Sequence, residues 1–295
     1  MLSHLLTGNT FMTSIAFIGA GRLGTTLARA FAAQGLPVRA IASRRRDAAE
    51  QLAAQVVGAQ AVSGDEAAQA DLVFLTVPDD AIAPLVQRLP WRAGQAVVHC
   101  SGATEVSVLD AAARAGAAIG GFHPLQIFSD PDLALAQLPG STVAIEGEPA
   151  LAATLRGIAE RLQMQAMTLP PGARALYHGG ASFAASFLLS MLDEAVAAWG
   201  SFGVPPEQAL QALLPLARGT LESAARKGLA GALAGPVSRG DAGVVKRHHD
   251  AFAQLGAEHL AFYREMTRRQ LRLADAAGRL GDAQRQALIE AAGLA

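Results

Sequence analysis

A glycine-rich turn near the start of the chain limits what the chain can fold into. Residues 14 to 30, SIAFIGAGRLGTTLARA, place Gly19, Gly21 and Gly24 in G-x-G-x-x-G spacing, after an apolar run and before a helix-period segment. In dinucleotide-binding folds the first glycine makes a tight turn and the second lets a pyrophosphate approach the backbone. The third lets helix and strand pack closely. The context predicts a strand–turn–helix unit that binds a dinucleotide; the alternative is a glycine turn needed only for packing.

Short apolar runs alternate with helix-period segments from Ser14 to about Thr168. Continuous apolar strands between amphipathic helices predict a mostly parallel sheet covered on both faces, which is an α/β domain of the Rossmann type. The expected strands are 15–18, 38–42, 72–77, 96–100, 118–121, 142–145 and 165–168. The expected helices are 22–34, 47–55, 80–88, 105–115 and 149–164.

The sequence pattern changes after Pro170-Pro171, because no segment beyond these prolines has the short apolar runs expected of strands. Long helices are expected near 172–199, 206–226, 241–255, 257–276 and 282–292. The Pro-Pro-Gly segment therefore predicts a domain boundary. The expected organisation is a disordered or leader segment at 1–13, a nucleotide-binding domain at 14–170 and an all-helical domain for substrate and dimerisation at 171–295.

Composition narrows the class of protein. Hydrophobic residues make up 51% of the chain and charged residues 17%, which favours a large core over disorder. The net charge of -1 gives no electrostatic argument for a nucleic-acid or membrane partner. The single cysteine, Cys100, excludes an internal disulfide framework and fits the cytoplasm. The uncharged run 175–192 contains a histidine, glycines and serines, so we interpret it as a buried helix and not as a membrane span.

The segment IASRRRD, residues 41 to 47, indicates which nucleotide is bound. The second strand ends where NAD-preferring proteins place an acidic residue, yet Ser43, Arg44 and Arg45 occupy these positions. A carboxylate would repel a 2′-phosphate, whereas guanidinium groups offer planar donors that match phosphate oxygens. The segment predicts NADP in preference to NAD. The alternative is that the arginines only solvate the start of a helix.

Two later turns also follow buried strands. VPDDAI at 77–82 and HCSGAT at 99–104 lie at carboxyl ends of expected strands, where ligands of open α/β sheets collect. Cys100 is better explained as a buried, inert thiol than as a nucleophile. The predicted cofactor-binding residues are Gly19, Gly21, Arg22, Leu23, Gly24, Ser43, Arg44, Arg45, Val77, Pro78 and Ser101.

Polar residues in the helical half suggest a substrate site. In 174–192, His178, Ser182 and Ser186 are spaced four apart on one helix face, although a lone histidine there is more often a hydrogen-bonded core residue. His123, just after an expected strand, faces the cleft or only fixes its loop. Arg239 binds a substrate carboxylate or forms an internal salt bridge. The predicted substrate-binding residues are Ser101, Gly102, His123, Ser186 and Arg239.

Four motifs resemble a known bacterial family. HCSGA (99–103), GFHPLQIF (121–128), YHGGASFAASF (177–187) and ALAGPVSRGDAGVVKRHH (232–249) are similar to proteins that join a Rossmann-like domain to the domain of unknown function DUF2520. The wider superfamily includes 6-phosphogluconate and β-hydroxyacid dehydrogenases, ketopantoate reductase and pyrroline-5-carboxylate reductase. The resemblance implies an NADP-type oxidoreductase fold whose helical domain is of the 6-phosphogluconate dehydrogenase type, with no settled substrate.

The resemblance also implies roles for two residues. In β-hydroxyacid dehydrogenases the first long helix carries a lysine that donates a proton and an asparagine four residues later. The matching positions here are His178 and Ser182, so the lysine is absent, although imidazole can act as a general acid near neutral pH. We therefore take His178 and Ser182 as candidate catalytic residues.

Two function classes follow from these observations. The first is an NADP(H)-dependent oxidoreductase that acts on CH–OH or CH–NH groups of a small carbonyl or imine substrate held between the domains. The second is a non-catalytic nucleotide-binding protein on a dehydrogenase fold. We expect a cytoplasmic homodimer through the helical domain, with a small-molecule substrate and neither nucleic acid nor membrane as partner. The adjacent His248 and His249 have poor metal geometry, so no metal site is expected.

Overall fold

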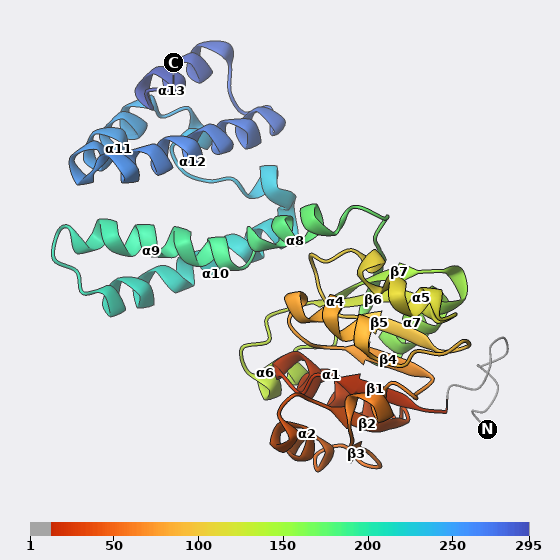
Figure 1. Ribbon diagram of the computed structural model, residues 1–295. Coiled ribbons are helices and arrows are strands. Elements are labelled where there is room, and N and C mark those ends of the chain that lie inside the picture. Colours follow the sequence, from red (N-terminus) through yellow and green to blue (C-terminus); the bar gives the residue numbers. More distant parts are fainter. Residues whose placement is uncertain (1–12, 295) are drawn as a thin grey trace. The chain divides into compact units, whose positions relative to one another are not determined.

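The computed structural model describes residues 13–294 (Figure 1). The leader predicted at 1–13 lies outside the described residues apart from Thr13. The chain divides into two compact units, one ending at Ala185 and the other beginning at Ser186. The predicted domain boundary at Pro170-Pro171 comes before helix α8 (Arg174–Ser182), which nevertheless belongs to the unit that contains the sheet.

The first unit is built on an eight-stranded sheet with the order β3-β2-β1-β4-β5-β6-β7-β8. All neighbouring strands are parallel except β6 and β7, which are antiparallel. This confirms the predicted mostly parallel sheet. The strands are β1 (Ile15–Ile18), β2 (Val38–Ala42), β3 (Gln60–Ala61), β4 (Leu72–Leu75), β5 (Ala96–His99), β6 (Ala118–Leu125), β7 (Thr142–Gly147) and β8 (Gln165–Thr168).

Helices connect these strands and cover both faces of the sheet (Figure 1). They are α1 (Arg22–Ala33), α2 (Arg46–Ala53), α3 (Gly64–Ala67), α4 (Asp79–Arg88), the 3₁₀ turn η1 (Val106–Leu109), α5 (Asp110–Arg114), α6 (Pro131–Ala136) and α7 (Pro149–Arg161). Alternate residues of β1 point to opposite faces of the sheet and so contribute to two different cores. Ile15 and Phe17 pack with α1, α2 and α7, whereas Ala16 and Ile18 pack with α3, α4 and α5.

Four aromatic rings mark the centre of the first core. Phe17, Phe31, Phe74 and Phe122 are fully buried, and the ring centroids of the contacting pairs lie 5.1 to 6.3 Å apart. Three of these rings come from the central strands β1, β4 and β6, and one comes from α1. The cluster therefore joins α1, which follows the glycine turn, to the middle of the sheet.

The structure differs from the sequence prediction in several elements of this unit. The helix expected at 105–115 is η1 followed by the short α5, and neither β3 nor α6 was predicted. Strand β6 runs four residues further than the expected 118–121, because antiparallel pairing with β7 extends it through His123 and Pro124. His123 therefore lies within a strand, opposite Ala144, and not just after one.

The second unit is helical throughout its described residues. Its elements are α9 (Ser186–Gly200), α10 (Pro206–Ala232), the 3₁₀ turn η2 (Val237–Arg239), α11 (Ala242–Leu255), α12 (Ala257–Ala276) and α13 (Asp282–Ala291). Gly228, with φ 69°, interrupts the helical geometry within α10. A small core of Val237, Val245, Leu271, Ala274, Leu288 and Ala292 joins η2, α11, α12 and α13.

The helix predicted over 172–199, with burial predicted for its uncharged run 175–192, differs from the structure in two respects. Helix α8 ends at Ser182 and α9 begins at Ser186, so the helix is interrupted. Within the described chain α9 buries none of its residues, and Arg174 is the buried residue of α8. By length and composition alone, the stretch Arg174–Gly200 could cross a membrane. The sequence indicated an apolar segment but not what would cover it.

Candidate functional site

The glycine turn between β1 and α1 is held tightly against the end of β4. Gly19 has φ 123°, and a Cβ there would lie 2.6 Å from the backbone carbonyl of Thr76. A Cβ on Gly24 would overlap the Gly19 oxygen and lie 2.7 Å from Thr76 Oγ1. Thr76 Oγ1 also donates a hydrogen bond to the Gly19 oxygen, at 2.7 Å. Two of the three glycines are therefore required by packing, and Thr76, which the sequence analysis missed, sets the shape of the turn.

Gly21 differs from the other two glycines. Among residues 13–294, a Cβ at this position would meet nothing within 4 Å. Gly21 is also the N-cap of α1, where no side chain caps the helix. The first turn therefore offers backbone N–H groups to an open space, which suits a pyrophosphate. Of the predicted neighbours, Arg22 is exposed and donates to the Ser129 oxygen at 3.3 Å, and Leu23 is half-buried.

The three arginines after β2 are not equivalent. Arg45 forms an ion pair with Asp47, and Arg46 pairs with Glu50 at 2.9 Å one turn along α2. Arg44 is exposed and has no hydrogen bond or ion pair within residues 13–294. Ser43 Oγ accepts a hydrogen bond from the Arg45 backbone at 3.3 Å. Arg45 and Arg46 thus have acidic partners within their own segment, while Arg44 has none among the described residues.

The ends of β4 and β5 supply the next predicted residues. Val77 is half-buried and Pro78 is exposed at the start of α4, whereas Ser101 and Gly102 are buried after β5. Ser101 Oγ accepts a hydrogen bond from the Thr104 backbone at 3.0 Å. Cys100 is 3% exposed, and burial raises the pKa of its thiol well above the ordinary range. This supports the interpretation of Cys100 as an inert thiol.

A buried polar row crosses β5, β6 and β7 beside these turns. His99 is opposite Gly121 in β6, and Gly121 is opposite Glu146 in β7. Arg174 enters the row from α8 with its side chain fully buried. Its Nε donates to Glu146 at 2.9 Å, and a Cβ on Gly121 would overlap its Nη2. The guanidinium therefore fills the side-chain space that Gly121 leaves empty.

Two nitrogens in this row have no partner among the described residues, His99 Nε2 and Arg174 Nη2. His99 Nδ1 accepts a hydrogen bond from the Ser101 backbone at 3.2 Å, so Nε2 carries the hydrogen of the neutral ring. Burial first, and then the charges of Arg174 and His123, lower the pKa of His99 to about 3. His99 is therefore neutral at physiological pH.

Two further imidazoles meet over Gly102. A Cβ on Gly102 would lie 2.8 Å from His123 Nε2 and would overlap His178 Cδ2, and the two rings have centroids 5.9 Å apart. His123 Nδ1 lies 2.9 Å from the hydroxyl oxygen of Tyr177. Burial, followed by His178 and Arg174, lowers the pKa of His123 to about 4. The structure thus places a neutral His123, fixed by Tyr177, beside the exposed His178.

Ser182 lies one turn beyond His178 in α8, and the remaining predicted site residues lie in the helical unit. Ser182 Oγ donates to the His178 backbone oxygen within its own helix, at 3.3 Å. Ser186 and Arg239 belong to the helical unit, so the predicted continuous stripe His178–Ser182–Ser186 is broken by the end of α8. Arg239 is exposed and forms no ion pair with Asp241 in the described chain, and Asp241 caps α11 through Val244 N at 3.1 Å.

Tyr177, Arg174 and Glu146 were missed by sequence reasoning. Tyr177 precedes His178 in the motif YHGGASFAASF, but the periodicity of α8 alone does not show that the Tyr177 hydroxyl reaches His123. Arg174 and Glu146 are 28 residues apart in sequence, and they meet because the Arg174 side chain lies over Gly121, which pairs with Glu146 across β6 and β7. A charged residue directly before an apolar helix was the available signal for Arg174, and it is a weak one.

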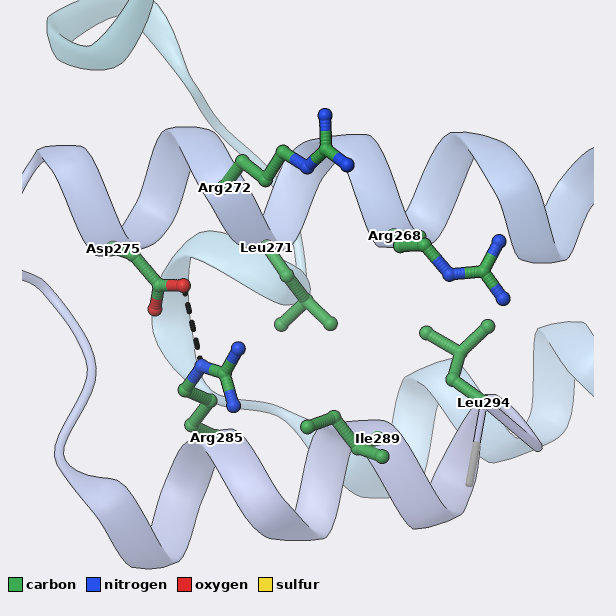
Figure 2. A pocket seen from close by; sticks show the side chains of 7 residues that line it. All are labelled: Arg268, Leu271, Arg272, Asp275, Arg285, Ile289 and Leu294. Atoms are coloured by element: carbon green, nitrogen blue, oxygen red, sulfur yellow. Dashed lines mark hydrogen bonds and ion pairs between the residues drawn. The ribbon is translucent and has the colours of Figure 1, made fainter.

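The helical unit has a pocket of its own, with a volume of about 300 Å³ (Figure 2). Figure 2 shows Arg285 reaching Asp275, an ion pair of 3.2 Å, beside apolar side chains. None of the predicted site residues lines this pocket. Its lining residues are Arg268, Leu271, Arg272, Asp275, Arg285, Ile289 and Leu294.

Comparisons with known proteins assign both halves of the chain. Residues 9–124 match the Rossmann-like domain, and residues 141–270 match the domain of unknown function DUF2520. No curated protein matches the chain.

Several solved structures share the fold over nearly the whole chain. Protein TM1727 from Thermotoga maritima is 22% identical, with a TM-score of 0.76, covering 90% of this chain and 100% of its own. BF3122 from Bacteroides fragilis, a “putative NADP oxidoreductase”, is 25% identical, with a TM-score of 0.69 and coverages of 88% and 98%. A reductive aminase from Aspergillus terreus in complex with NADPH and ethyl levulinate is 20% identical, with a TM-score of 0.64 and coverages of 95% and 99%.

These matches define the class of fold. The chain shares the two-part fold of these structures, a mostly parallel Rossmann-type sheet followed by helices, and α9 is exposed within the described residues. The predicted fold class is confirmed. The chain therefore carries a Rossmann-like domain, of the fold that binds nucleotide cofactors, followed by a DUF2520 domain.

Proposed function

We propose that the protein is an NADP(H)-dependent oxidoreductase that acts on a small carbonyl or imine substrate. The observation that carries this proposal is the meeting of His123 and His178 over Gly102. Both histidines lie in the sheet-containing unit, which also holds the open glycine turn. An imidazole ring can both hold and accept a proton, which suits it to general acid–base work.

Different residues of the sheet-containing unit have different proposed roles in binding the cofactor and in transferring the proton. Gly19, Gly21 and Gly24 with the start of α1 would hold the pyrophosphate, and Arg44 would bind the 2′-phosphate. When bound, the nicotinamide supplies the hydride that reduces the substrate carbon. His178, exposed beside Gly102, holds the proton that the substrate oxygen or nitrogen needs. Neutral His123 can give that atom a hydrogen bond through Nε2.

The solved structures support the same class of reaction. The Aspergillus terreus reductive aminase is bound to NADPH, and an imine reductase from the same organism is in complex with NADPH4 and dibenz[c,e]azepine. Those proteins are about 20% identical to this chain, so they support the fold and suggest the substrate class. The roles of Ser182, Ser186 and Arg239 remain predictions from the sequence.

Nucleotide binding tests the proposal first. In a fluorescence titration, we expect NADPH to bind about 10-fold or more tightly than NADH, because Arg44 is free to pair with the 2′-phosphate. Arg44→Asp should reverse this preference by placing a carboxylate where NAD-binding proteins have one. Arg46→Ala is the matched control, since Arg46 already pairs with Glu50, and it should leave the preference unchanged.

Two results would count against this assignment. If neither nucleotide binds, the oxidoreductase proposal fails. If NADPH binds but Arg44→Asp has no more effect than Arg46→Ala, Arg44 is not the reader of the 2′-phosphate. A protein that binds NADPH tightly yet reduces none of a panel of carbonyls and imines would fit the alternative function, a non-catalytic nucleotide-binding protein.

We also propose that the protein forms a cytoplasmic homodimer through its helical unit. Leu189 in α9 is 68% exposed and Leu216 in α10 is 69% exposed, although both are large and apolar. Such faces are rare on soluble monomers and mark association surfaces. A second copy is the proposed partner, because isologous pairing covers the same face on both chains.

Light scattering tests this proposal. The expected mass is twice the 30.3 kDa of one chain, and the double variant Leu189→Asp with Leu216→Asp should give the monomer mass. Val57→Asp, at a side chain 94% exposed in the other unit, is the control. A monomeric wild-type protein, or one that floats with neutral lipid vesicles, would overturn the proposal.

A further inference from the structure

Helix α8 is fastened to the sheet mainly by polar contacts. Arg174 is the buried residue of this nine-residue helix. The carboxylate of Glu105 accepts hydrogen bonds from the backbone of Gly172 at 3.1 Å and from the backbone of Arg174 at 3.2 Å. The first turn of α8 is therefore held from two sides, by Glu105 on its backbone and by the side chain of Arg174.

The Arg174 side chain reaches the floor of the candidate site. Its Nε donates to Glu146 at 2.9 Å, and its Nη1 donates to the Ser101 backbone oxygen at 2.7 Å. Ser101 directly precedes Gly102, over which the two histidines meet. The guanidinium lies over Gly121, which is opposite His99 on one side and Glu146 on the other. One buried side chain thus contacts both the β5 turn and β7.

The position of Arg174 determines where the next helical turn lies. Tyr177 and His178 follow by three and four residues, so they lie on the same side of α8 as Arg174. Tyr177 reaches His123 at 2.9 Å, and His178 reaches the space over Gly102. Without the anchor, little else in α8 is buried that could hold these two side chains against the sheet.

We propose that Arg174 is the positioning residue of the candidate site. Its guanidinium lies over Gly121, between His99 and Glu146. In this position it holds Tyr177 against His123 and His178 against Gly102. This inference rests on the proposed function for its catalytic meaning, but the geometry it describes can be measured without substrate or cofactor. No other cation among the described residues forms an ion pair with Glu146.

Tyr177 reports on the position of α8 through its own titration. Burial raises the pKa of Tyr177 above 10.0, while the charge of Arg174 acts to lower it. If Arg174 only contributes charge, removing it should leave Tyr177 buried and raise its pKa further. If Arg174 holds α8 in place, removing it should release Tyr177 to solvent, and its pKa should fall toward 10.0. The two roles predict opposite signs.

The chain has two tyrosines, so the measurement is simple. In a Tyr263→Phe background, Tyr177 is the only phenol, and its ionisation can be followed by ultraviolet absorbance while circular dichroism confirms that the protein is folded. We expect Arg174→Met in this background to lower the pKa of Tyr177. An unchanged or raised pKa in the folded variant would overturn the proposal.

A second variant perturbs the position of the Arg174 guanidinium over Gly121 and leaves every charged residue in place. A methyl at Gly121 would overlap Arg174 Nη2 and lie 2.8 Å from Cζ, so Gly121→Ala should displace the guanidinium and also lower the pKa of Tyr177. Gly157→Ala in α7 is the control, because a Cβ there meets nothing within 4 Å. If Gly121→Ala and Gly157→Ala give the same titration as the parent protein, Arg174 is not a positioning residue.

Failure of this inference is distinguishable from failure of the proposed function. NADPH titration of the parent protein tests the function, whereas the tyrosine titration requires no nucleotide. With any substrate found for the enzyme, Arg174→Met should lower kcat by about 100-fold, since small misplacements near the reacting groups have effects of this size. The affinity for NADPH should change by about twofold or less, because within the described residues the hydrogen bonds of Arg174 go to Glu105, Glu146 and Ser101 and not to the glycine turn.

Discussion

Replacing His178 with alanine is expected to lower turnover by about 10²- to 10⁴-fold, the usual contribution of a positioned general acid. His178 is exposed beside Gly102, and the neighbouring His123 stays neutral down to about pH 4 because burial and nearby positive groups lower its pKa. His123 is therefore a poor substitute as a proton donor at neutral pH. The measurement is single-turnover oxidation of NADPH with the best carbonyl or imine substrate.

The same variant should bind NADPH about as well as the parent protein, within about twofold, if His178 acts only in the chemical step. His248→Ala is the matched control, because His248 is an exposed histidine of the helical unit that contacts Tyr263. Two outcomes would remove His178 from its proposed role: equal losses of turnover and NADPH affinity, or no loss of either.

The variants Gly21→Ala and Gly24→Ala are expected to lose different properties, NADPH binding in the first and stability in the second. A methyl on Gly24 would overlap the Gly19 oxygen and lie 2.7 Å from Thr76 Oγ1, so Gly24→Ala should lower the free energy of unfolding by about 3 kcal/mol. A methyl on Gly21 meets nothing within 4 Å, so Gly21→Ala should change stability by about 1 kcal/mol or less. It should nevertheless weaken NADPH binding by about 100-fold, because the methyl occupies the space of the pyrophosphate.

Urea unfolding and NADPH titration of both variants check this pair. The two glycines serve as controls for each other, since both changes add one methyl group to the same turn. If Gly21→Ala binds NADPH normally, the open space at Gly21 is not the phosphate site. If Gly24→Ala is as stable as the parent protein, the turn is more adaptable than its packing against Thr76 indicates.

Local sequence patterns were sufficient to predict most of the strands and helices of the first unit. Apolar runs of four or five residues with helix-period segments between them predicted β1, β2 and β8 with their observed bounds, and they predicted the parallel sheet. The glycine spacing predicted the turn before α1, because a positive φ and close packing leave few alternatives to glycine at positions 19 and 24. The positive φ of Gly19 and the approach of Gly24 to the Gly19 oxygen are short-range constraints, so a single sequence displays them.

Sequence patterns were less informative where the pairing between distant strands decides the length of an element. Strand β6 contains two glycines and a proline, so its composition did not show that it continues past Gly121 to Leu125. Antiparallel pairing with β7 provides the missing partner and places His123 inside the sheet. The break between α8 and α9 was hidden for a similar reason, since an apolar helical pattern continues through residues 183–185.

The sequence by itself therefore determined the class of fold, the nucleotide turn and the two histidines as candidates. Only the tertiary structure decided that Arg44 is the one of the three arginines after β2 that lacks a partner among the described residues, that Thr76 shapes the glycine turn, and that Arg174 fills the space over Gly121. The physical reason is distance along the chain. Arg174 and Ser101 are 73 residues apart, and Thr76 and Gly19 are 57 apart. Such contacts depend on strand register and helix placement, which no short stretch of sequence specifies.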